Sequence, residues 1–108
     1  MAYHDSSLHA AFTALADPTR RDLFEAIAAR PCSVAALAAN RPISRPAVSQ
    51  HLKVLREARL VKAEPQGTKR IYSLDTAGLQ AIRSYLDQFW TDALGAYSAE
   101  VHRRISET

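Results

Sequence analysis

Apolar residues recur every three or four positions along most of this chain, which is the spacing of one buried face on a helix. The pattern predicts five helices, over about residues 7–16, 18–30, 33–39, 44–58 and 76–104. Before the last of them, at about residues 60–74, two short runs rich in β-branched and aromatic residues flank Gln66-Gly67-Thr68, which indicates a β-hairpin. The chain is therefore predicted to be a single, mainly α domain with a two-stranded hairpin.

Polar residues mark the ends of these helices. Asp17 and Ser44 each precede a predicted helix, where a side-chain oxygen can accept a hydrogen bond from a free backbone N–H. The last helix begins in the same way after Asp75 or Thr76. Asn40 follows the third helix, and we expect it to adopt the left-handed conformation that often ends a helix.

The third and fourth predicted helices, with the turn between them, have the layout of a helix-turn-helix at about residues 33–58. On the fourth helix Val48, Leu52 and Leu55 share one face, which can pack on the preceding helix. The opposite face carries small and polar residues: Pro46, Ser49, Gln50 and Lys53. In a helix-turn-helix this second helix enters the DNA major groove.

The hairpin directly after this pair turns the motif into a winged helix, with the wing at about residues 60–74. Lys69 and Arg70 lie beside its turn, and Thr68 lies within it. We expect the wing to lie along the phosphate backbone or to reach the adjacent minor groove.

The positive charge of the chain is concentrated on the proposed helix-turn-helix and wing. Residues 41–70 carry eight basic and two acidic side chains, a net charge of +6, whereas the whole chain of 108 residues carries +3. Such a surface gains affinity for DNA by neutralising phosphates and releasing their counterions. The alternative is a solvated basic face that has no partner.

Several other classes of protein are disfavoured by what the sequence lacks. Its one cysteine cannot form an internal disulfide, and no apolar run approaches the ~20 residues of a membrane span. Residues 1–7 do not resemble a signal peptide, so we expect a cytoplasmic protein without membrane contact. Phosphate-binding glycine loops and nucleophile motifs are also missing, so we predict no enzyme, no catalytic residue and no cofactor.

The last helix predicts a homodimer. It carries one apolar seam at 3-4 spacing and a second stripe beside it, and a small winged core cannot bury both. A symmetric pair built from the first helix, residues 7–16, and the last, residues 76–104, would cover the surplus. The predicted interface residues are Leu8, Phe12, Leu79, Ile82, Leu86, Phe89, Trp90, Ala93 and Tyr97.

Three segments, residues 14–21, 44–61 and 70–74, resemble the ArsR-type (arsenic-repressor-like) winged-helix regulators. The resemblance extends over about residues 8–97. It implies a homodimeric bacterial or archaeal transcription factor, usually a repressor, with about five helices and a two-stranded wing. The first and last helices form the dimer interface of the family, and many members release their DNA operator when an effector binds.

The resemblance also implies which residues meet the DNA. The base-facing positions of the family fall on Arg45, Pro46, Ser49 and Gln50; Arg45 suits a guanine edge and Gln50 an adenine edge. Lys53, Lys69 and Arg70 suit phosphates. His51 lies nearer the core side of the helix, which favours packing or a phosphate contact. The complete predicted DNA-binding set is Ser44, Arg45, Pro46, Ser49, Gln50, His51, Lys53, Thr68, Lys69 and Arg70.

The metal-binding motifs of the family are absent from the chain. Ser33 and Ala35 occupy the positions of a thiolate pair, and Cys32 stands alone. Phe89 stands where the zinc-type site of the last helix needs a histidine. His4, Asp5 and His9 lie close together in sequence, but we interpret them as a solvated end. We therefore predict no metal site.

The effector and the partner remain open to other interpretations. Cys32 precedes a helix that could lower its thiol pKa and make it redox-sensitive, or it is an inert loop residue. Phe89, Trp90 and Tyr97 could line a small-molecule pocket at the dimer interface, or they are ordinary core. The chain could also be a protein-interaction module that does not bind specific DNA.

Overall fold

The computed structural model describes residues 6–107, so the segment examined for a signal peptide lies largely outside it. The elements are α1 (Ser6–Ala16), α2 (Pro18–Ala29), α3 (Val34–Ala39), α4 (Arg45–Glu57), β1 (Val61–Gln66), β2 (Lys69–Leu74) and α5 (Thr76–Ser106). Within the described range, five helices and one antiparallel hairpin confirm the predicted winged helix-turn-helix.

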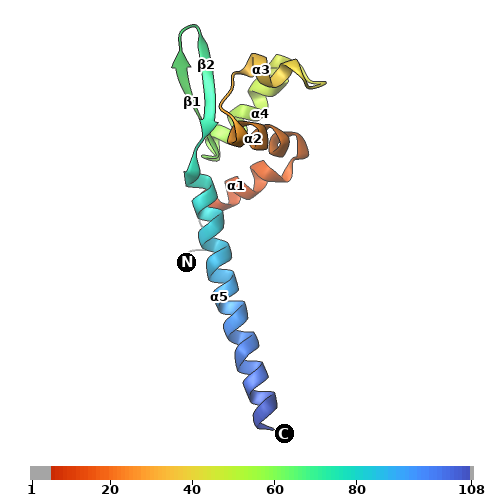
Figure 1. Ribbon diagram of the computed structural model, residues 1–108, viewed down its shortest axis with the longest axis vertical. Coiled ribbons are helices and arrows are strands. Elements are labelled where there is room, and N and C mark those ends of the chain that lie inside the picture. The colour runs from red at the N-terminus through yellow and green to blue at the C-terminus, as the bar shows by residue number, and fades with distance from the viewer. Residues whose placement is uncertain (1–5, 108) are drawn as a thin grey trace.

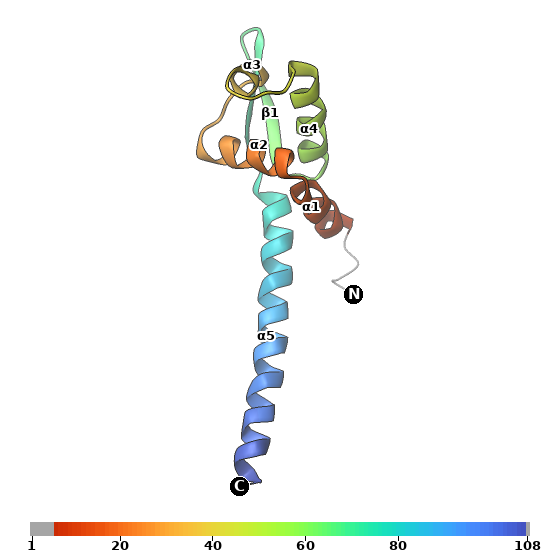
Figure 2. The same ribbon diagram turned by 90° about the vertical axis from the view of Figure 1, so that its right-hand side faces the viewer.

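The first four helices and the hairpin form a body at one end of the molecule, and α5 projects from it (Figures 1 and 2). The whole measures 70 × 27 × 20 Å, so α5 determines its length. The hairpin, α3 and α4 lie at the end of the molecule that is farthest from the C-terminus.

The predicted apolar faces meet inside this body. Burial of one such aliphatic side chain stabilises the fold by roughly 1.5–3 kcal/mol. The largest fully buried side chains are Leu23, Ile27, Leu37, Val48, Leu52, Leu55, Leu60 and Val61. Because α4 contributes three of these, its polar face is left to point outward.

Three predicted helix caps are present. The side chains of Asp17, Ser44 and Asp75 accept hydrogen bonds from backbone N–H groups of the helix that follows each of them. The prediction for Asn40 was wrong, because its φ is −112°. The left-handed residue is instead Arg59, with φ of 59°, at the end of α4.

A Schellman motif forces this conformation on Arg59. The N–H of Leu60 donates to the carbonyl of Leu55 at 3.0 Å, and the N–H of Arg59 donates to that of Arg56 at 3.0 Å. Leu55 and Leu60 are both fully buried, which supplies the apolar contact that accompanies this motif. The chain thus turns sharply from the reading helix into the wing.

The hairpin closes through two residues, Gly67 and Thr68, since Gln66 pairs with Lys69 as the last strand position. Gly67 has φ of +65°, which glycine adopts without steric cost. At the other end of the hairpin Cys32 forms two backbone hydrogen bonds with Tyr72, of 3.0 and 2.8 Å. This pairing ties the loop before α3 to the base of the wing.

The first turn of α5 is locked against the end of α4. The N–H of Gly78 donates to the carbonyl of Arg59 at 2.8 Å, and the N–H of Asp75 donates to that of Leu60 at 3.0 Å. A Cβ at Gly78 would lie 2.6 Å from the carbonyl oxygen of Ala58, closer than van der Waals contact allows. Only glycine therefore fits here without displacement of backbone.

We expect Gly78→Ala to lower the free energy of unfolding by about 2 kcal/mol, because overpacking outweighs the better helix propensity of alanine. Gly95→Ala is the matched control on the same helix, since a Cβ there meets nothing within 4 Å. That variant should gain up to about 1 kcal/mol. Urea unfolding measures both, and equal stabilisation of the two variants would contradict the close approach.

Candidate nucleic-acid interface

The outward face of α4 carries the residues predicted to read bases. Arg45, Pro46, Ser49 and Gln50 are exposed, as is Lys53 one turn later. The hydroxyl of Ser44 is engaged in capping α4, where it accepts from the N–H of Ala47 at 3.3 Å. The wing residues Thr68, Lys69 and Arg70 are exposed as well. The fold therefore presents the predicted helix and wing residues on its surface.

His51 has a different environment from its neighbours on α4. It is half-buried, and its charge contributes to lowering the pKa of Asp17, although the largest cause is the backbone hydrogen bond from Arg20. His51 therefore lies close to the junction of α1 and α2, away from the base-reading face. Its predicted role, packing or a phosphate contact in preference to base reading, stays a prediction.

Arg20 and Arg21, within a segment that carries the family resemblance, have a structural role. The guanidinium of Arg20 donates to the carbonyls of Ala14 and Thr13 at 2.9 and 3.1 Å, and that of Arg21 donates to the carbonyl of Leu15 at 2.8 Å. These bonds satisfy carbonyls at the C-terminal end of α1. The motif therefore joins α1 to α2.

The basic segment, residues 41–70, divides into paired and unpaired cations. Arg41 pairs with Asp22 at 2.7 Å and donates to the carbonyl of Leu37, and Lys62 lies 3.9 Å from Glu64. In the part of the chain that the structure describes, the other six cations form no side-chain hydrogen bond or ion pair. They are Arg45, Lys53, Arg56, Arg59, Lys69 and Arg70. Most of the unpaired charge thus lies on α4 and the wing.

A notch of about 360 Å³ separates α4 from the wing. Ser49, Gln50 and Lys53 line it from α4, together with Arg56, and Arg70 lines it from β2. The sequence prediction did not include Arg56. Its spacing from Ser49 and Lys53, seven and three residues, places it on their helical face and was the available signal.

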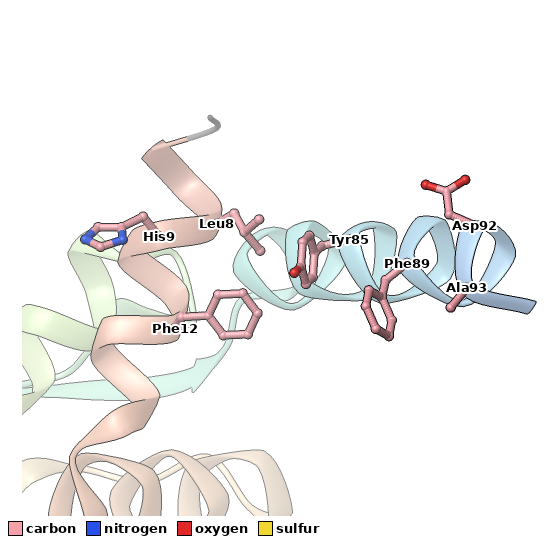
Figure 3. A pocket seen from close by; sticks show the side chains of 7 residues that line it. All are labelled: Leu8, His9, Phe12, Tyr85, Phe89, Asp92 and Ala93. Atoms are coloured by element: carbon pink, nitrogen blue, oxygen red, sulfur yellow. The ribbon is translucent and has the colours of Figure 1, made fainter. Parts of the chain in front are cut away.

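A separate hollow, lined mostly by apolar side chains, lies between α1 and α5 (Figure 3). Its lining encloses about 680 Å³ and includes Leu8, His9, Phe12, Tyr85, Phe89, Asp92 and Ala93. The rings of Phe12 and Tyr85 meet edge to face, with their centroids 5.8 Å apart. Tyr85 stacks on Phe89, with 6.4 Å between the ring centroids. This contact joins the first helix to the middle of the last.

The nine predicted dimer residues differ in how much of each is exposed. Leu8 is only 7% exposed and Leu79 and Ile82 pack against the core, so these three are already largely covered within one chain. Ala93 is half-buried. The others remain exposed, by 41 to 69%: Phe12, Leu86, Phe89, Trp90 and Tyr97. Four of these five exposed apolar side chains lie on α5, and they form the surplus predicted for that helix.

The structure does not support Cys32 as an activated thiol. Burial raises the pKa of Cys32, and the nearby charges of Arg41 and Arg30 offset this only in part. The raised pKa favours the second alternative, an inert residue, over a redox-sensitive thiol, and the backbone pairing with Tyr72 keeps Cys32 half-buried.

The other candidate effector sites are a small-molecule pocket and a metal site. Phe89 lines the surface in Figure 3, whereas Trp90 lines a separate hollow along α5 and Tyr97 lines neither. Within a single chain these three aromatic residues do not share one hollow, and a small-molecule pocket formed by them between two copies stays a prediction. Among residues 6–107 no group of three or more potential ligands could hold a metal, and His4 and Asp5 lie outside that range.

Comparison with known proteins identifies the family. A family described as a helix-turn-helix domain matches residues 15–64. The HTH-type transcriptional regulator Rv2034 of Mycobacterium tuberculosis is 57% identical over 98 residues, 91% of this chain and 92% of its own. The crystal structure of an ArsR family transcriptional regulator superposes with a TM-score of 0.75 at 26% identity, over 84% of this chain and 94% of that one. This chain belongs to the ArsR-type family.

A shorter similarity links this ArsR-type chain to a protein described as a repressor. The transcriptional repressor SmtB homolog of Synechocystis is 46% identical over 63 residues, 58% of this chain. Those residues span about half the length of that relative, 48%.

The family establishes the general activity. The chain is a DNA-binding transcriptional regulator and not an enzyme, because the matched family and relatives are regulators. Across the described residues, no helix is long and apolar enough to span a membrane.

Proposed function

We propose that this ArsR-type regulator is a homodimeric repressor that binds an inverted-repeat operator through α4 and the wing. The observation that carries the proposal is the coincidence of two features on α4. Its exposed face bears, at its N-terminal end, the side chains predicted to read bases, and cations without a protein partner lie on and beside that face. A regulator of this family meets its operator in the cytoplasm, where we expect this chain to act.

The outward residues of α4 have the chemistry that sequence reading needs. The guanidinium of Arg45 matches the two acceptors of guanine, and the amide of Gln50 matches the acceptor and donor of adenine. Ser49 between them is small enough to let the helix approach the groove. Lys69 and Arg70 on the wing match phosphates, which position the protein without reading sequence.

Dimerisation rests on the exposed apolar residues of α1 and α5. Phe12, Phe89 and Trp90 are each 43 to 56% exposed, and a second copy would bury them. A twofold axis through this surface would give two reading helices for two half-sites one helical turn apart, ~34–36 Å. Repression, in particular, is supported by the repressor described among the relatives.

Selection from a randomised DNA pool, at near-physiological salt, tests the proposal directly. We expect an enriched inverted repeat, because a symmetric dimer presents α4 twice. The selection is repeated with zinc and with oxidant, which tests the sensor alternatives. Recovery of no enriched sequence would instead favour a protein-interaction module.

We expect Gln50→Ala to weaken binding to the selected operator by about 1–3 kcal/mol and to relax the preference at one base pair, because the amide reads a base edge. Lys69→Ala should weaken operator and random DNA alike, because the ammonium contacts phosphate. Titrations of both duplexes measure the difference. If Gln50→Ala weakened both duplexes equally, its base-reading role would be wrong.

We expect Leu86→Glu combined with Phe89→Glu to give folded monomers, because both side chains are 41 to 47% exposed within one chain. Sedimentation gives the mass, and far-UV circular dichroism reports the fold. Ser84→Glu is the control, since Ser84 is exposed on the opposite face of α5. A dimer that survived the double substitution would move the interface elsewhere.

A further inference from the structure

We propose that the notch between α4 and the wing binds one phosphate of the DNA backbone, held between Arg56 and Arg70. The inference rests on the proposed function and specifies the chemistry of a site within that interface. It adds Arg56 to the DNA-binding residues and gives α4 and the wing a shared ligand.

The notch has donors on both of its sides. Ser49, Lys53 and Arg56 follow one another at i, i+4 and i+7 along α4, so they lie in one row on its surface. Arg70 comes from β2, where it pairs with Pro65 one position from the end of the hairpin. Tyr72, which also lines the notch, is 7% exposed and belongs to the core.

The charge of the notch is not balanced by the protein. Among the described residues no carboxylate lines it, and Lys53, Arg56 and Arg70 have no side-chain partner there. Some other arginines of the chain do have carboxylate partners: Arg41 pairs with Asp22 at 2.7 Å, and Arg104 pairs with Glu100 at 2.8 Å. Three cations around one concave site repel one another, and a bound anion would relieve that repulsion.

The position of Arg56 favours a backbone phosphate over a base. Recognition helices contact bases with their N-terminal residues. Arg56 stands seven residues after Ser49, which is about 10 Å farther along the helix axis. At that distance from the base-reading end, the edge of the groove presents phosphates, and the planar guanidinium can hold two phosphate oxygens at once.

The same phosphate would fix the wing relative to the reading helix. Arg70 and Arg56 approach the notch from different elements, so an anion between them bridges β2 and α4. The contact between wing and DNA then depends on α4 being seated in the groove. If Arg56 and Arg70 instead bound two different phosphates, their contacts with DNA would be independent of each other.

A methylphosphonate scan tests the inference, because it replaces one charged phosphate of the selected operator at a time with a neutral group. The full-length protein and its Arg56→Gln and Arg70→Gln variants are titrated with each duplex. With the unsubstituted protein, neutralising the bridged phosphate should weaken binding by about tenfold. In both variants the same position should lose this effect.

The salt dependence gives a second, independent measure. Arg56→Gln should reduce the slope of log affinity against log salt by about 0.9 per protomer on operator and random duplexes alike. Combining the two substitutions should weaken binding by less than the product of the single effects, because both contact one phosphate. Arg56→Lys should keep most of the salt slope, because lysine retains the charge. It should bind DNA more tightly than Arg56→Gln but less tightly than the unsubstituted protein, because an ammonium cannot make the two-pronged contact of a guanidinium.

Arg104→Gln is the matched control, because it removes the same charge at the distant end of α5 (Figure 1). It should leave affinity and slope unchanged. Two results would overturn the shared site: a slope that Arg56→Gln leaves unaltered, or different sensitive phosphates for Arg56 and Arg70. Either result can occur while the unsubstituted protein still binds its operator, and the proposed function would then survive. If the unsubstituted protein bound no operator at all, both proposals would be wrong.

Discussion

The fold depends on the close contact between the first turn of α5 and the last turn of α4. Backbone groups of Ala58, Arg59 and Leu60 are packed against Gly78 or bonded to the segment from Asp75 to Gly78. Three parts of the molecule meet at this point: the reading helix ends, the wing begins and the long helix starts. Because the contact is made by backbone atoms, which cannot adapt by changing rotamer, the relative orientation of these parts is closely constrained.

This junction also links the two surfaces for which functions are proposed. Backbone hydrogen bonds of 2.8 and 3.0 Å join the first turn of α5 directly to the residues that follow α4. The exposed apolar residues of α5 begin about two turns later. The surface proposed for dimerisation and the surface proposed for DNA are therefore mechanically joined through one chain.

The arginines of this chain serve two different purposes. Arg20 and Arg21 donate hydrogen bonds to carbonyls at the end of α1. Arg41 pairs with the carboxylate of Asp22 in α2. These bonds help to hold α1, α2 and α3 together. Arg45, Arg56 and Arg70 have no such partner within the described residues. Net charge alone does not separate these groups, since Arg41 belongs to the basic segment but is committed to Asp22. The cations that are free to bind DNA are those that the fold has not already paired with a carboxylate or a carbonyl.

The sequence by itself determined what depends on neighbours along the chain. Periodicity located the helices, polar caps located their starts, and the outward positions of α4, such as Ser49 and Gln50, followed from the buried row of Val48, Leu52 and Leu55. Only the tertiary structure decided what depends on distant segments. It placed the left-handed residue at Arg59 instead of Asn40, because Leu60 must enter the core there, and it paired Cys32 with Tyr72, which desolvates the thiol. It also brought Arg56 and Arg70 to the same notch. The sequence could not show this, because no local pattern records how a hairpin folds back beside a helix.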